Sequence, residues 1–195
     1  MNHSNNHKKV QKLTLLGLLA AISIVLVGLI HFPLMPAAPF LEYDPADIPI
    51  FIGTFLLGPV GGFLLTVVAS TIQGLTVSAA AGPIGIIMHI LATGIFTVVA
   101  GNIYRRKKSK KSALLALLAG VIAQTGMMVL CNMIFTPIFM GAPLEDVIGM
   151  LVPIIIPFNL IKGGINAVVT YVVYKPVSNF AHKLLGEKTE DMHAA

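Results

Sequence analysis

The sequence predicts an all-α integral membrane protein, a compact bundle of six transmembrane helices of which one is short or partly re-entrant. Of its 195 residues, 56% are hydrophobic and 11% are charged, and the mean hydropathy is +0.88. A typical soluble domain carries about 25% charged residues, and a soluble chain this apolar would expose large adhesive patches to water. The charges are also segregated: between residues 13 and 104, only Glu42, Asp44 and Asp47 are charged. A water-soluble fold is therefore excluded.

Apolar segments alternate with turn signals along the chain. A bilayer core of about 30 Å needs roughly 20 residues of helix, and Gly-Pro pairs and a basic loop mark the breaks. The predicted helical segments are 13–31, 48–57, 60–79, 83–104, 113–136 and 148–174. We interpret the first as a retained helix, because no small-residue cleavage site of a signal peptide follows it. The membrane domain then covers residues 13–178, between tails at 1–12 and 179–195.

The basic residues indicate how the bundle is oriented. They cluster at 8–12, at 105–111 and at 175–188, and each cluster flanks an apolar segment. This is the positive-inside pattern of membrane proteins. We therefore expect a multi-pass protein of the cytoplasmic membrane with both termini and the 105–111 loop in the cytoplasm. The same pattern explains the sequence pI of about 9.4 without a nucleic-acid partner.

The short element follows from counting crossings. Two cytoplasmic basic clusters, at 8–12 and 105–111, require an even number of crossings between them. Residues 13–31 and 83–104 each cross once, so 48–82 must cross twice or dip and return, although two full crossings take about 40 residues. A broken helix in the membrane is tolerated where protein covers its backbone ends. We therefore expect the Gly58-Pro59 break to lie in the interior.

Several function classes find no support in the sequence. It contains no G-x-x-x-x-G-K-[ST] motif for ATP hydrolysis and no Ser/His or paired-Asp arrangement of an intramembrane protease. The single cysteine, Cys131, cannot form an intrachain disulfide, and the acidic residues of 42–47 match no calcium loop. We expect a protein that is not an enzyme and has no metal or cofactor.

Lys162 is the strongest candidate for a functional residue. It lies near the middle of the last apolar segment, where a charge costs about 2.5–3.5 kcal/mol even on the lenient insertion scale. At 100° per residue, Asn159, Lys162 and Asn166 share an arc of about 60° on one helix face. Such a lysine should face the bundle with a partner. Ligand contact is the favoured interpretation, and a structural ion pair with Glu42, Asp44 or Asp47 is the alternative.

Other intramembrane polar residues are ambiguous. An amide such as Asn132, Gln73 or Gln124 can form a helix–helix hydrogen bond worth about 0.6 kcal/mol, and for Gln124 that structural role is preferred. His31 and His89 lack metal-ligand spacing, so packed or interface histidines are expected.

The acidic loop also has a structural explanation. Asp44 before Pro45 suits a helix N-cap with proline at the first helical position, and Asp47 would then sit in the first turn, where the helix dipole favours it. Separately, Gly17 and Ala21 form a small-xxx-small pair that lets helices approach closely.

Two stretches resemble a known family, the S components of energy-coupling factor (ECF) vitamin transporters, and within it the riboflavin-specific branch. One is Leu41-Glu-Tyr-Asp-Pro-Ala-Asp-Ile-Pro49 with Gly58-Pro59, and the other is Pro157-Phe-Asn-Leu-Ile-Lys-Gly163. The resemblance extends from the first helix to about Lys175.

This resemblance implies a six-helix bundle that binds a vitamin near its outer face, beneath the first external loop. It implies assembly with a membrane-embedded coupling subunit and two cytoplasmic ATPases, with riboflavin as the transported ligand. In the riboflavin branch, amides and a lysine contact the flavin, and small residues of the first helix pack against the coupling subunit. Those interface residues would be Gly17 and Ala21. The ligand contacts would be Asn132, Asn159 and Lys162, with Leu41, Glu42, Tyr43, Asp47 and Gln73 expected beside them.

Two alternatives remain open. The chain could be an S component for another vitamin, a related flavin or a nucleobase-like molecule. It could also be a membrane scaffold in which Lys162 pairs with a loop carboxylate and no ligand binds.

Overall fold

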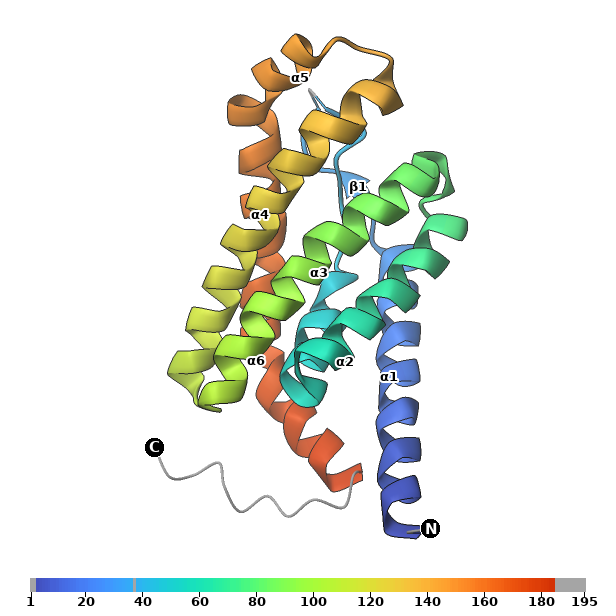
Figure 1. Cartoon of the computed structure of the whole chain (residues 1–195), viewed down its shortest axis with the longest axis vertical. Helices are drawn as coiled ribbons and strands as arrows, with labels where there is room; N and C mark the ends of the chain where they lie inside the picture. Colours follow the sequence, from blue (N-terminus) through green and yellow to red (C-terminus); the bar gives the residue numbers. More distant parts are fainter. Residues whose placement is uncertain (1–2, 37, 185–195) are drawn as a thin grey trace.

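The computed structural model describes residues 3–36 and 38–184 and is almost entirely helical (Figure 1). Its elements in order are α1 (His3–Leu29), β1 (Phe32–Pro33), β2 (Glu42–Tyr43), α2 (Asp47–Leu75), the 3-10 turn η1 (Ala79–Ala81), α3 (Gly82–Arg106), α4 (Lys110–Met140), α5 (Leu144–Met150), the π-helical turn η2 (Leu151–Ile155) and α6 (Ile156–Leu184). Five stretches are long and apolar enough to cross a membrane: Lys9–Leu29, Asp47–Leu75, Ala79–Arg106, Lys110–Met140 and Leu144–Asn179. The predicted all-α membrane bundle is confirmed. α1 begins at His3, ahead of the predicted start at residue 13.

The short element is the first arm of α2. Helical geometry breaks at Gly58, with φ 81° and ψ −180°, and the two arms, 47–57 and 59–75, run side by side in opposite directions (Figure 1). A Cβ built on Gly53 in the first arm would lie 2.6 Å from Leu65 in the second. With the arms counted separately, the described residues contain the six membrane segments that the sequence predicts. The arm 47–57 is the short segment, and the chain reverses direction after it at Gly58.

Gly58 and Pro59 make this reversal sterically feasible. A φ of +81° lies in the left-handed region, which glycine enters without the penalty that a Cβ imposes. Pro59 then starts the second arm, where its missing N–H and fixed φ suit a first helical turn. The turn is half-buried and lies beside Gly101, near the basic end of α3, so the expectation of an interior break was wrong. The protein instead covers the first arm, where Ile50 and Phe51 are fully buried and Phe51 stacks on Phe96 with ring centroids 3.6 Å apart.

Close packing at this turn leads to a testable prediction. A Cβ on Gly101 would lie 2.8 Å from the Pro59 Cα and 2.9 Å from its nitrogen, and backbone atoms cannot yield as a flexible side chain can. We expect Gly101→Ala to lower the free energy of unfolding by about 1–3 kcal/mol. The control is Gly126→Ala, because nothing lies within 4 Å of a Cβ there, so the protein should keep its stability or gain up to about 1 kcal/mol. Thermal unfolding in detergent distinguishes the two, and equal effects would contradict the packing of the turn on α3.

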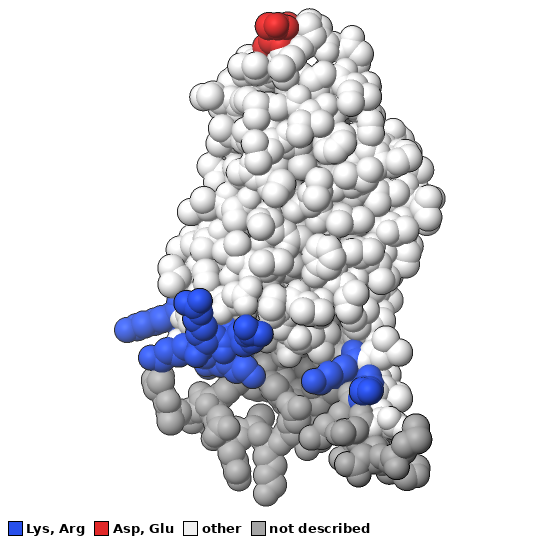
Figure 2. Space-filling model, viewed as in Figure 1, with Lys and Arg blue, Asp and Glu red and all other residues white. Residues whose placement is uncertain are grey.

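Charge divides the molecule into two ends (Figure 2). Lys and Arg gather where α1 begins and where α3 joins α4, and acidic side chains lie at the opposite end, where Figure 1 places α5. The surface between the ends is uncharged in this view, as a lipid-facing band requires. The predicted segregation of charge is thus present in three dimensions.

The loop between α1 and α2 lies near the acidic end and contains a short strand pair. Phe32 pairs with Tyr43 and Pro33 with Glu42 in a short antiparallel ladder. Below it, Ala38 and Leu41 belong to a buried apolar cluster with residues of α5, η2 and α6. This packing holds the loop against the start of the last helix.

The start of α2 agrees in part with the sequence-based prediction. The helix begins at Asp47, its N-cap is Ala46, and that cap makes no side-chain hydrogen bond. The regular helix therefore begins two residues after Pro45, the predicted first helical residue, and Asp47 lies in the first turn as predicted. Asp44 Oδ1 accepts a hydrogen bond from the Ala46 backbone N–H at 3.0 Å, which is the bond that a capping aspartate makes to the N–H two residues on. Its other oxygen, Oδ2, reaches α6.

Candidate functional site

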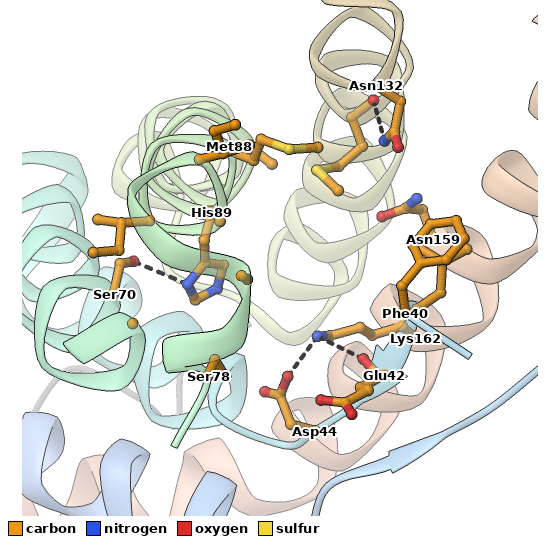
Figure 3. Close-up of a pocket in the computed structure, with 18 of the residues that line it drawn as sticks. Phe40, Glu42, Asp44, Ser70, Ser78, Met88, His89, Asn132, Asn159 and Lys162 are labelled. Atoms are coloured by element: carbon orange, nitrogen blue, oxygen red, sulfur yellow. Dashed lines mark hydrogen bonds and ion pairs between the residues drawn. The ribbon is translucent and has the colours of Figure 1, made fainter. Parts of the chain in front are cut away.

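A cavity of about 230 Å³ lies between the loop at residues 40–44 and helices α2, α3, α4 and α6. Its walls include the start of α2, the end of α4 and the start of α6, which places it toward the acidic end. Figure 3 shows Asn132, Asn159 and Lys162 on one side, with Ser70 and His89 facing them from the other. Seven of the eight predicted ligand-contact residues line this cavity: Leu41, Glu42, Asp47, Gln73, Asn132, Asn159 and Lys162.

Lys162 faces inward and has an acidic partner. Its Nζ lies 2.7 Å from Asp44 Oδ2 and donates to the Glu42 backbone oxygen at 3.3 Å (Figure 3). The Asp44 side chain is only 8% exposed and that of Lys162 17%. The structural ion pair considered from the sequence therefore exists. Its lysine also lines the cavity.

Asn166, the third residue on this helix face, holds the loop. Its side-chain oxygen accepts a hydrogen bond from the Tyr43 hydroxyl at 3.1 Å, and its Nδ2 donates to the Asp44 backbone oxygen at 3.2 Å. Burial and then the negative charge of Asp44 raise the pKa of Tyr43, so the phenol keeps the proton that it donates. Tyr43 does not line the cavity. Its hydrogen bond to Asn166 joins the loop to α6.

The two predicted asparagines differ in the hydrogen-bonding capacity that they leave free. Asn132 donates to the Met128 backbone oxygen at 2.7 Å and accepts from the Thr136 hydroxyl at 2.8 Å, so both bonds stay within α4. Asn159 donates to the Ile155 oxygen at 2.8 Å. Within the described part of the chain, the Oδ1 of Asn159 has no hydrogen-bond partner and remains available to a ligand.

Asp47 is the centre of a buried polar network at the inner wall. Its Oδ1 accepts hydrogen bonds from His89 Nε2 at 3.0 Å and from the Thr93 hydroxyl at 3.1 Å. Its Oδ2 accepts from Gln124 Nε2 at 3.3 Å. The other ring nitrogen of His89 lies 2.9 Å from the Ser70 hydroxyl. One carboxylate thus connects α2, α3 and α4 across the cavity.

His89 and Gln124 were not predicted as site residues, yet both line the cavity. The one local signal was the spacing of His89 and Thr93, which puts two polar side chains on the same face of α3. Their partner Asp47 is more than 40 residues away in the chain, so sequence spacing does not reveal it. His31 lies elsewhere, after the end of α1, and its ring is 3.1 Å from the Val27 backbone oxygen of that helix.

The remaining candidates lie outside the cavity. Gly17 and Ala21 are exposed on α1, and no atom lies within 4 Å of a Cβ built on Gly17. Among the residues that the structure describes, no group of three or more His, Cys, Asp and Glu side chains could hold a metal ion.

The geometry can be compared with known proteins. The family model described as "ECF transporter, substrate-specific component" matches residues 11–174. The chain belongs to this family. It is therefore a multi-pass membrane subunit that binds a transport substrate and is not an enzyme, which confirms the resemblance drawn from the sequence.

Two relatives and a solved structure are similar to this S component along most of its length. It is 31% identical to "Riboflavin transporter RibU" of Staphylococcus aureus (strain TCH60), covering 92% of this chain and 96% of the relative. It is 27% identical to "Riboflavin transporter FmnP" of Bacillus subtilis (strain 168), covering 85% and 91%. A structure described as "Structure and mechanism of the S component of a bacterial ECF transporter" superposes with a TM-score of 0.75 at 31% identity, covering 88% of this chain and 98% of that one.

Proposed function

We propose that this S component binds riboflavin in the cavity and mediates its uptake, with ATP hydrolysed by partner subunits. The observation that carries the proposal is the arrangement of Asn132, Asn159 and Lys162 around one cavity, in a chain similar along most of its length to proteins named riboflavin transporters. A flavin is a flat, largely apolar ring system with polar edges and a hydroxylated chain. It suits an apolar cavity with a few placed amides and one cation.

The walls of the cavity suggest how such a ligand would lie. Charged groups gather on the side of the loop, where Glu42, Asp44 and Lys162 meet. Away from the loop, the lining includes apolar residues of α3 and α4 such as Met88, Ala92 and Met128. The hydroxylated chain would therefore lie toward the loop and the ring toward the interior.

The individual contacts are part of the proposal. Asn159 Oδ1 and the Lys162 ammonium would bond the polar edges of the ligand, and Asn132 would lie against it. Leu41, Glu42, Gln73 and Asp47 would contribute from the wall. Tyr43 would act through the loop, by the hydrogen bond of its hydroxyl to Asn166.

We further propose that the basic end of the bundle faces the cytoplasm, by the positive-inside rule. Both termini, with tails at 1–12 and 179–195 around the membrane domain, would then be cytoplasmic, and the cavity would lie toward the outer surface of the cytoplasmic membrane. The exposed face of α1 around Gly17 and Ala21 would contact a membrane-embedded coupling subunit that carries two cytoplasmic ATPases.

Uptake of labelled riboflavin tests the function directly. Cells that lack riboflavin transport should take up the vitamin when they produce this chain together with an ECF coupling subunit and its ATPases. Cells that produce those partners alone serve as the control. Uptake no greater than that control, with the chain present in the membrane, would contradict the proposal. Uptake of a different vitamin would instead support the alternative substrate.

Asn159→Leu tests the ligand contact of one amide. The change removes a free acceptor and an intrahelical bond, so we expect riboflavin to bind about 10-fold more weakly, the usual value of one hydrogen bond. Asn102→Leu is the matched control, because Asn102 also donates to the backbone oxygen four residues earlier, at 2.8 Å, and does not line the cavity. Equal riboflavin affinity of the two variants, measured by fluorescence titration, would argue against Asn159 as a contact.

A further inference from the structure

The lining of the cavity carries a net negative charge. It contains three carboxylates and one lysine: Glu42, Asp44, Asp47 and Lys162. His89 is the other lining residue that can become a cation, and even when it is protonated the carboxylates outnumber the cations. A concave site lined with an excess of one charge disfavours a ligand of the same sign, so this cavity disfavours an anion.

The three carboxylates differ in how far their charge is offset. Asp44 is paired with Lys162 at 2.7 Å, and Asp47 accepts hydrogen bonds from three side chains. Within the described part of the chain, the carboxylate of Glu42 has no hydrogen-bond or ion-pair partner, and the residue is exposed. Glu42 therefore supplies an accessible negative charge that no cation pairs with.

Glu42 lies on the side of the cavity where the hydroxylated chain of a bound flavin would lie. Figure 3 shows it beside Asp44 and Lys162, which form the charged side of the site. An ionised carboxylate can only accept hydrogen bonds, and the hydroxyls of riboflavin can donate them. A phosphate esterified to the end of the same chain carries about 1.5 to 2 negative charges at pH 7 and presents acceptor oxygens. It would meet Glu42 with the same charge and with no hydrogen to donate.

We infer that Glu42 is a specificity-determining residue, which selects the uncharged flavin against its phosphate ester. The inference rests on the proposed function. Its carboxylate accepts from the hydroxylated chain of riboflavin and repels a phosphate in the same place. Lys162 does not cancel this effect, because its ammonium is already paired with Asp44.

The affinities of the purified chain for riboflavin and for riboflavin 5′-phosphate test the inference. By fluorescence titration, the parent should bind riboflavin at least about 10-fold more tightly than the ester, because two like charges meet in the second complex. Glu42→Gln keeps the size of the side chain without its charge and should lower this ratio of affinities about 3- to 10-fold. Glu42→Lys reverses the charge and should lower the ratio further. If both variants keep the parental ratio, the inference is overturned.

Glu145→Lys is the matched control. Glu145 is also an exposed carboxylate at the acidic end, in the first turn of α5, but it does not line the cavity. Salt screens exposed charges that are further apart than about 8 Å at physiological ionic strength, so this variant should keep the ratio within about twofold. A fall as large as that of Glu42→Lys would show that the acidic end as a whole sets the ratio, which would contradict a role specific to Glu42.

Salt separates repulsion from poor fit. Between about 0.1 M and 1 M NaCl the screening length shortens from roughly 10 Å to 3 Å. The parental ratio should therefore fall toward that of Glu42→Gln, whose own ratio should change less. A parental ratio that does not depend on salt would show that the phosphate is excluded by its size, and the inference would be wrong.

The outcomes separate the inference from the proposed function. If the folded parent binds neither flavin, the proposed function fails and the inference fails with it. If the parent binds riboflavin but binds the phosphate ester equally well, the proposed function stands and the inference alone is wrong.

Discussion

Lys162→Met is expected to weaken riboflavin binding by about 10- to 150-fold, the range of a hydrogen bond to a charged group, about 1.5–3 kcal/mol. Lys162 is a cation in the cavity wall, 2.7 Å from Asp44, and methionine keeps its length without its charge. The measurement is quenching of riboflavin fluorescence by purified protein.

The same substitution also leaves Asp44 without its partner. Removing one member of a buried ion pair can cost about 3–5 kcal/mol of stability, so a loss of binding could arise from loss of folding. The double variant Lys162→Met with Asp44→Asn removes that unpaired charge and keeps the oxygen that accepts from Ala46. We expect it to recover most of the thermal stability and none of the affinity. Parental affinity in the double variant would show that Lys162 is a structural residue.

Gly17→Leu should leave riboflavin binding intact and abolish most of the assembly with the coupling subunit. Gly17 is exposed on α1 and nothing within this chain lies within 4 Å of its Cβ position, so leucine fits the isolated protein. At a helix–helix contact that depends on small residues, the same side chain would hold the helices apart. Co-purification of the coupling subunit with each variant measures the effect.

Gly126→Leu is the matched control for this interface. Gly126 is also exposed, lies on α4 and has nothing within 4 Å of its Cβ position. We expect this variant to assemble as the parent does. Equal recovery of the coupling subunit with the Gly17 and Gly126 variants would place the interface elsewhere.

Much of the fold was predictable because its determinants are local. The apolar segments, the two Gly-Pro breaks and the basic clusters each follow from a short stretch of sequence. Lys162 stood out for the same reason, since a charge in the middle of an apolar segment needs a partner wherever the helix packs. Its inward orientation and its pairing with a loop carboxylate agree with that expectation.

The polar network was not predictable, because it joins residues far apart in the chain. Asp47 meets His89 and Gln124 only after three helices have packed, across separations of 42 and 77 residues. Asp44 makes one local and one distant contact. One oxygen bonds the Ala46 backbone N–H, as its local sequence predicts for a capping aspartate. The other oxygen reaches Lys162 on α6, a contact for which the sequence left three candidate carboxylates.

The most direct test of the central claim is an equilibrium titration of the purified chain with riboflavin, with other vitamins as comparisons. We expect saturable binding at one riboflavin per chain, and tighter binding of riboflavin than of every other vitamin tested. A correctly folded chain that does not bind riboflavin, or that binds another vitamin more tightly, would contradict the account.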